Sequence, residues 1–139
     1  MKYWVWLTTL PGLGERAKLQ LLAHFGSPEE IYFAPEGELL LVEGITKLQA
    51  ALLADKSLDR AEKVLEDCAK DGQFLLTMDD AGYPARLRNI YDPPLLLYGK
   101  GSLPLFDDEV AVTVVGARDC TPYGVRAASQ LGVELARLG

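Results

Sequence analysis

The sequence predicts an α+β chain in which a small all-α domain, residues 1–72, precedes the incomplete start of an α/β domain, residues 73–139. Apolar residues recur at helical spacing through the first half, where glycine-containing turns separate the segments. After residues 71–73 the pattern changes to short apolar runs, and the last run leads through a glycine turn into a long amphipathic segment. We therefore place a domain boundary near residues 71–73.

The first half is expected to consist of short helices. Ser27 and Pro28 mark a capped helix start, with serine as N-cap and proline at the first helical position. The segment Leu58–Lys70 carries one apolar stripe on an acidic surface. Other helices are expected at Glu15–Phe25, around Glu36–Leu41 and at Thr46–Ala54, and Trp4 and Trp6 are expected to anchor the first helix.

The second half is expected to alternate strands and loops before one helix. Short strands are predicted at Phe74–Met78, Leu95–Gly99 and Val110–Val115, with a loop at Leu103–Glu109. Pro93 and Pro94 exclude a helix before the second strand, because proline lacks the backbone donor. The final helix is predicted at Pro122–Leu138, with Thr121 as its N-cap.

Composition and charge narrow the function classes. Hydrophobic residues make up 49% of the chain, enough for a core, and no apolar run approaches the length of a membrane span. The net charge of −6 excludes a broad basic surface, and residues 55–80 hold 8 acidic residues against 4 basic ones. Cys68 and Cys120 have no metal-ligand spacing, so we interpret them as reduced thiols of a cytoplasmic protein.

Two glycine turns, residues 11–14 and 42–45, each join two short helices. Such turns expose backbone N–H groups and form the phosphate-binding device of helix-hairpin-helix modules. The candidate weak phosphate contacts are Gly12, Gly14, Gly44 and Lys47. The alternative is that the glycines only permit tight turns, and the scarcity of basic residues favours that alternative.

The segment from Gly116 to Thr121 follows the third expected strand and precedes the last helix. It lacks the second and third glycines of a dinucleotide fingerprint, and no Gly-Lys-Ser/Thr sequence of a P-loop follows. A glycine, an arginine and a helix N-terminus remain, which suit a single phosphate. The alternative is that Arg118 pairs with Asp119 or with another surface acid.

Two blocks of residues, in this order and spacing, carry a family resemblance. The blocks are Tyr83-Pro84, Leu87, Ile90, Asp92-Pro93-Pro94, Leu97-Tyr98 and Gly101, and then Val114-Val115-Gly116, Arg118, Thr121, Tyr123-Gly124 and the helix ending Leu135-Ala-Arg-Leu-Gly139. They resemble the DNA-processing protein A family, also called DprA or Smf. The helical half is similar to that family's N-terminal domain, through the Leu-Pro-Gly-Leu-Gly and Phe-Gly-Ser turns.

The resemblance implies a helix-hairpin-helix/SAM-like domain followed by an extended Rossmann-like domain that binds single-stranded DNA, without catalysis, cofactor or metal. It implies a function in natural transformation and recombination, including the loading of a RecA-type recombinase. Gly116 would be the position of close DNA approach and Arg118 a phosphate ligand, with Ala117 between them and Thr121 as a supporting donor. Tyr123 is the better candidate for stacking on a base.

The sequence also departs from the family pattern. Ala117 stands where family members often have serine or threonine, so one hydroxyl donor is missing. The family's Rossmann-like domain is expected to continue past Gly139, through the self-association surface and the recombinase contact. We therefore interpret the sequence as a fragment that binds DNA more weakly than the intact protein.

Two other function classes stay open at this stage. A nucleotide-binding Rossmann enzyme would need a second glycine segment and an acid–base pair. A protein-interaction module would use the acidic helical half. Among single residues, Tyr83 is a further stacking candidate, Tyr98 is expected in the core, and His24 is expected to pack on or cap its helix. Asp79 and Asp80 are expected to form a solvated turn rather than a metal site.

Overall fold

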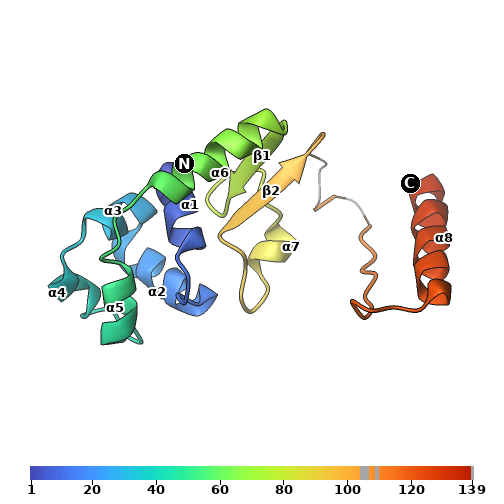
Figure 1. The fold of residues 1–139 in the computed structure, drawn as a ribbon. Helices are drawn as coiled ribbons and strands as arrows, with labels where there is room; N and C mark the ends of the chain where they lie inside the picture. Colours follow the sequence, from blue (N-terminus) through green and yellow to red (C-terminus); the bar gives the residue numbers. More distant parts are fainter. Residues whose placement is uncertain (104–106, 109, 139) are drawn as a thin grey trace. The chain divides into compact units, whose positions relative to one another are not determined.

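A computed structural model describes residues 1–103, 107–108 and 110–138 of the chain. Residue contacts divide it into two compact units, Met1–Asp107 and Asp108–Gly139. The first unit combines helices with a small sheet, and the second contains one long helix (Figure 1). The chain thus mixes helices and strands, as an α+β sequence should. Within the described ranges, no helix is both long and apolar enough to span a bilayer.

Helices form most of the first unit, and a pair of strands follows them. The elements are α1 (Lys2–Thr9), α2 (Glu15–Phe25), α3 (Pro28–Phe33), α4 (Glu36–Leu39), α5 (Lys47–Leu52), α6 (Asp59–Lys70), β1 (Gln73–Thr77), α7 (Ala85–Arg88) and β2 (Leu96–Lys100). These bounds confirm the predicted helices and the first two predicted strands to within a few residues.

Local hydrogen bonds explain where the short helices start and stop. Ser27 Oγ accepts the Glu30 N–H group at 3.2 Å, which confirms the predicted cap of α3. Thr46 and Gln49 form a reciprocal capping box at the start of α5. The prediction that the helix around Glu36 reaches Leu41 is wrong by two residues. There the Leu41 N–H group bonds to the carbonyl three residues earlier, at 3.0 Å, which tightens the chain into the next turn.

The helical part contains two hairpins with the same burial pattern. The first hairpin is α1, residues 10–14 and α2, and the second hairpin is α4, residues 40–46 and α5. An offset of 32 residues, from Gly12 to Gly44, relates each buried position of the second hairpin to a buried position of the first. The matched pairs are Leu7 and Leu39, Leu10 and Val42, Leu13 and Ile45, Lys18 and Ala50, and Leu21 and Leu53. The sequence did not reveal this repeat beyond its paired glycine turns.

Each turn packs against the second helix of the other hairpin. Gly12 and Gly44 both have φ +83°, in the left-handed region that favours glycine. A Cβ atom at Gly12 would lie 3.3 Å from Leu52, and one at Gly44 would lie 2.8 Å from Gln20. Gln20 and Leu52 are themselves equivalent under the 32-residue offset, so the contacts are reciprocal. Both hairpins therefore fold around one shared core.

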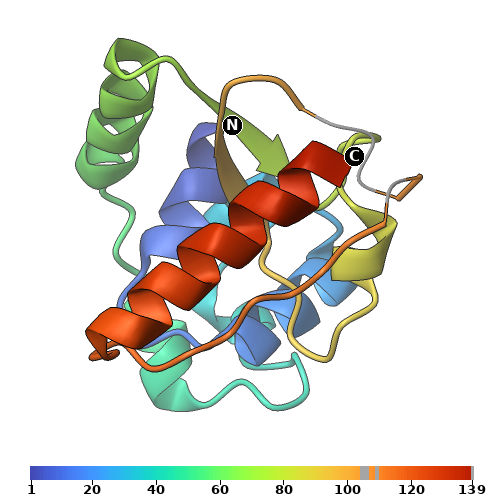
Figure 2. The ribbon, with the colours of Figure 1, turned by 90° about the vertical axis from the view of Figure 1, so that its right-hand side faces the viewer.

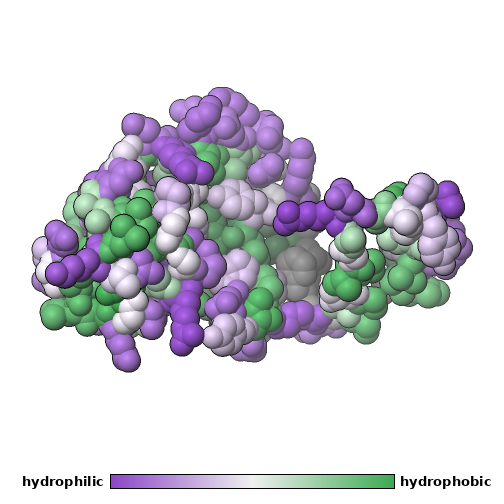
Figure 3. All heavy atoms as spheres, turned by 60° about the horizontal axis from the view of Figure 1, so that its bottom comes forward, coloured by the Kyte–Doolittle hydropathy of each residue, from purple (hydrophilic) through white to green (hydrophobic). Residues whose placement is uncertain are grey.

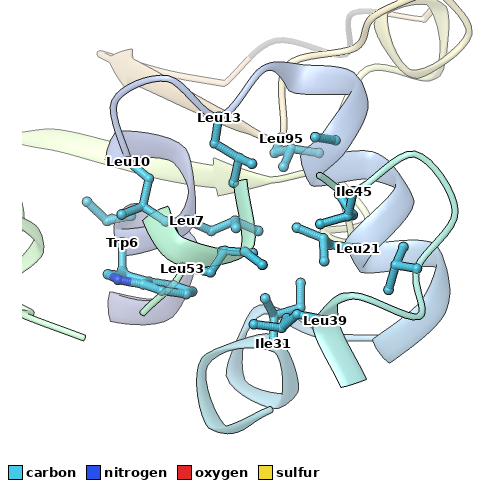
Figure 4. Packing of buried hydrophobic residues seen from close by; sticks show 14 of the residues in the cluster. Trp6, Leu7, Leu10, Leu13, Leu21, Ile31, Leu39, Ile45, Leu53 and Leu95 are labelled. Carbon is cyan, nitrogen blue, oxygen red and sulfur yellow. The ribbon is translucent and has the colours of Figure 1, made fainter. Parts of the chain in front are cut away.

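Figure 4 shows side chains from both hairpins converging in that core. Leu7 and Leu21 come from the first hairpin, Ile45 and Leu53 from the second, and all are buried. Lys18 occupies the core position that Ala50 fills in the second hairpin. Its Nζ atom donates to Glu15 Oε1 at 2.7 Å and to the Thr8 carbonyl at 3.2 Å, so the buried charge is paired.

The connector between α5 and α6 is fastened by two aromatic residues. Trp6 Nε1 donates to the Asp55 carbonyl at 2.9 Å, and the Tyr32 hydroxyl donates to the Lys56 carbonyl at 2.7 Å. The Lys56 ammonium lies over both rings, 5.3 Å from the Trp6 centroid and 5.1 Å from that of Tyr32. Burial lowers the pKa of Lys56. Trp6 is thus an anchor of the first helix, as predicted.

The strands pair antiparallel, with Gln73 opposite Lys100 and Thr77 opposite Leu96. Helix α6 packs against both α1 and β1 (Figures 1 and 2). Leu95 and Leu96 join the same core as the two hairpins. This shared core places the sheet in the first unit, and the domain boundary expected near residues 71–73 stays a prediction.

The loop between the strands is built around Tyr83, which is only 2% exposed. Its hydroxyl donates to the Pro94 carbonyl at 2.6 Å, and burial raises its pKa. The Arg88 guanidinium lies 5.4 Å from the ring centroid and donates to the Met78 carbonyl at 2.9 Å. Tyr83 is therefore a packing residue and is not accessible to a DNA base.

Two predictions about the strands are wrong. Tyr98 was expected in the core, but exposure rises along β2 from 6% at Leu96 to 48% at Tyr98, because the strand extends beyond the helical core. Residues 110–115 were expected to form a strand, but they have no regular secondary structure. An extended segment becomes a strand only by pairing, and no described segment pairs with this one. Most of the predicted loop 103–109 lies outside the described residues.

Gly44→Ala should lower the free energy of unfolding by about 1–3 kcal/mol, because the left-handed backbone disfavours a Cβ atom and Gln20 occupies its space. Urea denaturation followed by far-UV circular dichroism would measure the loss. Gly37→Ala in α4 is the matched control, since its Cβ would meet nothing within 4 Å and its φ is not positive. Equal losses in the two variants would contradict the assigned role of the turn.

Asp80 should titrate below the ordinary aspartate pKa of about 3.9. Its carboxylate accepts the Thr77 N–H group at 2.6 Å and the Thr77 hydroxyl at 2.7 Å, and these bonds lower its pKa. A depressed pKa stabilises the fold above the unfolded pKa, and this stabilisation is lost as the pH falls through the folded pKa. A carboxyl NMR titration would measure it, and Thr77→Val should move the pKa back up. An unchanged value in Thr77→Val would refute this cause.

Candidate nucleic-acid interface

The second unit places the candidate site between an extended segment and a helix. Residues 110–120 have no helix or strand, and α8 (Pro122–Leu138) follows with the predicted bounds. Thr121 is the N-cap that the sequence predicts. Its hydroxyl accepts the Gly124 N–H group at 3.2 Å, and its carbonyl accepts the Val125 N–H group at 3.1 Å.

These caps leave fewer free donors at the helix start than the sequence suggested. Pro122 has no N–H group, and those of Gly124 and Val125 are already bonded. In the described part of the chain, the Tyr123 N–H group has no acceptor. The Thr121 hydroxyl still carries a proton that it can donate. The helix therefore offers about two donors to an anion rather than a full ring of amides.

Arg118 is exposed in the turn that leads to α8. Among the described residues, no carboxylate lies within ion-pair distance of the Arg118 guanidinium. The neighbouring Asp119 does not pair with it either. The alternative of a local salt bridge therefore has no support in the structure. A guanidinium with its five donors unengaged is well suited to a phosphate group.

Gly116 has neither of the usual structural reasons to be glycine. Its φ is not positive, and a Cβ atom built on it would meet nothing within 4 Å. Backbone conformation and crowding within the described residues thus do not require glycine there. Ala117 is also exposed, so the backbone from Gly116 to Arg118 is open to solvent.

Two exposed side chains extend the site along the first turns of α8. Tyr123 is 73% exposed, and its ring is available for stacking. Arg126 is also exposed, one turn into the helix, and helical side chains tilt toward the N-terminus. The sequence reasoning missed Arg126, although its position five residues after the N-cap Thr121 could have indicated it.

The charge around this site is modest. The described residues of the second unit include Arg118, Arg126 and Arg137, balanced by Asp108, Asp119 and Glu134. Cys120 is an exposed free thiol beside the turn. Such a surface can neutralise a few phosphates and cannot support binding through a wide electrostatic field. No group of three or more potential metal ligands occurs in the described ranges.

The weaker candidates lie in the first unit, at the hairpin turns. Gly14 is the N-cap of α2 without a side-chain cap, but Glu15 adds a carboxylate to the first turn of that helix. Thr46 and Gln49 bond to each other across the start of α5, and Lys47 remains exposed. The positive φ values of Gly12 and Gly44 confirm the expected turn geometry. Phosphate binding at these turns stays a prediction.

The first block of motif residues has structural roles in this unit. Asp107 accepts the N–H groups of Ala85 at 2.8 Å and Arg86 at 3.1 Å, so it caps α7. These two bonds lower the pKa of Asp107. Together with the Tyr83–Pro94 hydrogen bond, this cap fixes the path of the chain between β1 and β2.

Removing the Thr121 cap should loosen the helix start beside the candidate site. Thr121→Ala should cost about 1 kcal/mol of helix stability, or about fivefold faster amide exchange in the first turn of α8. Hydrogen exchange of Gly124 and Val125, measured by NMR, would test this. Ser129→Ala, at an exposed position in the middle of the same helix, is the control. If both variants exchange alike, the cap contributes nothing.

Comparison with known proteins relates the site to a family. The family model described as DNA recombination-mediator protein A matches residues 74–139. The chain is 32% identical over 77 residues to the DNA processing protein DprA of Bacillus subtilis, which covers 55% of this chain and 26% of that protein. It is 28% identical over 141 aligned positions to Protein Smf of Synechocystis sp., which covers 99% of this chain and 35% of that protein.

The chain thus spans about a quarter to a third of the length of the curated relatives it matches. No solved structure matches it significantly. The family model covers the strands, the loop around Tyr83 and the whole candidate site, and one of the two relatives aligns with the helical hairpins as well. These matches agree with the resemblance that the two motif blocks carry. Over residues 74–139 the chain matches the DprA/Smf family of DNA-processing proteins, and both curated relatives carry that family's names.

Proposed function

We propose that the chain binds single-stranded DNA through the segment Gly116–Tyr123, without making or breaking a bond. The observation that carries this proposal is the exposed guanidinium of Arg118, which has no ion-pair partner among the described residues, beside a capped helix start. The family likeness suggests the substrate class, because the matched family model is described as a DNA recombination mediator. An interface to nucleic-acid phosphate is the chemistry that these groups can perform.

The mechanism would be capture of the DNA backbone. One phosphate would accept hydrogen bonds from the Arg118 guanidinium and from the Tyr123 N–H group, with the Thr121 hydroxyl as a third donor. The open backbone at Gly116 would let the strand approach closely, since no side chain intervenes there. Arg126 would neutralise a neighbouring phosphate, and the Tyr123 ring would stack on a base.

The preference for a single strand follows from the same arrangement. Stacking on Tyr123 requires an unpaired base whose face is exposed, which duplex DNA does not offer. The unit carries three arginines against four acidic residues, so it provides few phosphate contacts, and a duplex binder of similar affinity would need more. In the intact protein, this binding would serve DNA uptake and the loading of a RecA-type recombinase, in the cytoplasm.

Arg118→Ala should weaken binding of a fluorescein-labelled thymidine oligonucleotide, about 20 nucleotides long, by about tenfold or more. A charge-assisted hydrogen bond contributes about 1.5–3 kcal/mol, and its loss should also make the salt dependence less steep by about 0.7 in log–log slope. Fluorescence anisotropy at two salt concentrations would measure both quantities, with ¹⁵N NMR shift mapping if the affinity is low.

Arg137→Ala is the matched control, because it removes one exposed arginine from the far end of the same helix. Loss of binding in both variants to the same extent would indicate nonspecific charge rather than a site. A mononucleotide that saturates the protein as tightly as the oligonucleotide would favour a nucleotide-binding enzyme instead. Equal affinity for duplex and single-stranded DNA would refute the role of base stacking.

A further inference from the structure

The two hairpins have the same fold but differ in their contacts with the rest of the first unit. The first hairpin contacts the second half of the unit. Arg16 Nη1 donates to the Tyr91 hydroxyl at 3.0 Å, and helix α1, whose last turn carries Thr8, packs against β2. The face of the first hairpin that carries Thr8 and Arg16 is therefore directed toward the sheet and its preceding loop.

The equivalent face of the second hairpin is apolar and exposed. The 32-residue offset relates Thr8 to Leu40, Thr9 to Leu41 and Arg16 to Leu48. Leu40 is 37% exposed, Leu41 76% and Leu48 75%. We call these three leucines the second-hairpin patch. Polar residues thus occupy the face that contacts the sheet and its loop, where Thr8 and Thr9 are half-buried, whereas leucines occupy the equivalent exposed face of the second hairpin.

Exposed acidic residues lie close to the second-hairpin patch in the sequence. Glu36 and Glu38 lie on α4, Glu43 lies in the turn, and all three are exposed. Lys47 is the one basic residue among the described residues 36–52. Figure 3 shows apolar atoms interspersed with hydrophilic ones at this end of the unit. An acidic rim repels DNA and anionic lipid, so it selects for a basic partner.

A hollow beside α4 also combines apolar side chains with acidic ones, as the patch and its neighbouring glutamates do. It is lined by Phe25, Phe33 and Pro35, with Glu30 and Glu38 among its polar groups. Phe33 is 67% exposed. An apolar wall with two carboxylates suits a lysine or arginine side chain, whose alkyl stem packs on the rings while its charge meets the acids. Glu38 belongs to both the hollow and the rim of the patch.

We propose that the second hairpin docks a basic, amphipathic segment of a partner protein. Its apolar residues would cover the second-hairpin patch, and its lysine or arginine residues would pair with Glu36, Glu38 and Glu43. The partner segment would contact the face of the second hairpin that is equivalent to the sheet-contacting face of the first hairpin. A second copy of this chain would bring the same acids to the interface and would be repelled.

The test uses the whole chain and a synthetic amphipathic peptide of about 18 residues, with leucines on one helical face and lysines beside them. Fluorescence anisotropy should show saturable binding that weakens with salt, and ¹⁵N NMR shifts should be confined to residues 24–48, which include the patch and the lining of the hollow. Leu41→Ser with Leu48→Ser should reduce the affinity at least tenfold, and Glu36→Lys with Glu43→Lys should do the same. Both leucines are exposed, so the fold should persist, which circular dichroism would verify.

Two control variants distinguish docking at this patch from nonspecific apolar or electrostatic binding. Val110→Ser with Val115→Ser changes two exposed apolar residues of the other unit, and Glu62→Lys with Glu66→Lys reverses two exposed acids on α6. Both control proteins should bind the peptide like the original chain. Absence of peptide binding, equal binding of a glutamate-for-lysine peptide, or equal loss in the control proteins would overturn the proposal. So would a dimer, detected by sedimentation, that the double leucine substitution dissociates.

Discussion

The reciprocal packing of the two glycine turns is the constraint on which the first unit depends. Each turn lies against the second helix of the other hairpin, so that a Cβ atom at Gly12 would lie 3.3 Å from Leu52 and one at Gly44 would displace the end of the Gln20 side chain. Five matched pairs of buried positions then face the same core, which also receives Leu95 and Leu96 from the sheet. Without this close approach, the short helices α4 and α5 would have too little local stability to persist.

In the second unit, secondary structure forms only where backbone N–H and C=O groups find hydrogen-bond partners. The segment 110–115 is rich in valine, yet it forms no strand, because no described segment pairs with it. Helix α8 forms nonetheless, since its hydrogen bonds are internal and Thr121 caps its start. The candidate site is therefore organised by local interactions, the N-cap and the turn, and not by a completed sheet.

Local signals explain which features could be predicted from the sequence. Three helices begin after a serine or threonine whose side chain accepts the N–H group three residues later. These N-caps are Ser27, Thr46 and Thr121. The turn at Gly116–Arg118 was likewise visible as a strand-end glycine with an adjacent arginine. Its exposure, and the lack of an ion-pair partner for Arg118 among the described residues, could not be predicted, because both depend on where distant residues lie.

Features that depend on contacts between residues far apart in the chain could not be predicted from the sequence. The 32-residue relation between the hairpins rests on burial, and the matched positions share few identical residues, among them Leu7 with Leu39 and Gly12 with Gly44. Tyr98 looked like a core residue in an apolar strand, but its exposure depends on how far the helices extend along β2. A strand at 110–115 was expected from composition alone, which says nothing about a pairing partner.

The clamp on the α5–α6 connector gives the second hairpin a mechanical property. Trp6 and Tyr32 hold two successive carbonyls, of Asp55 and Lys56, and the Lys56 ammonium rests on both rings. These two hydrogen bonds attach the connector to α1 and α3. The second hairpin can therefore move relative to α1 and α3 only if both bonds break, so its orientation is tied to theirs.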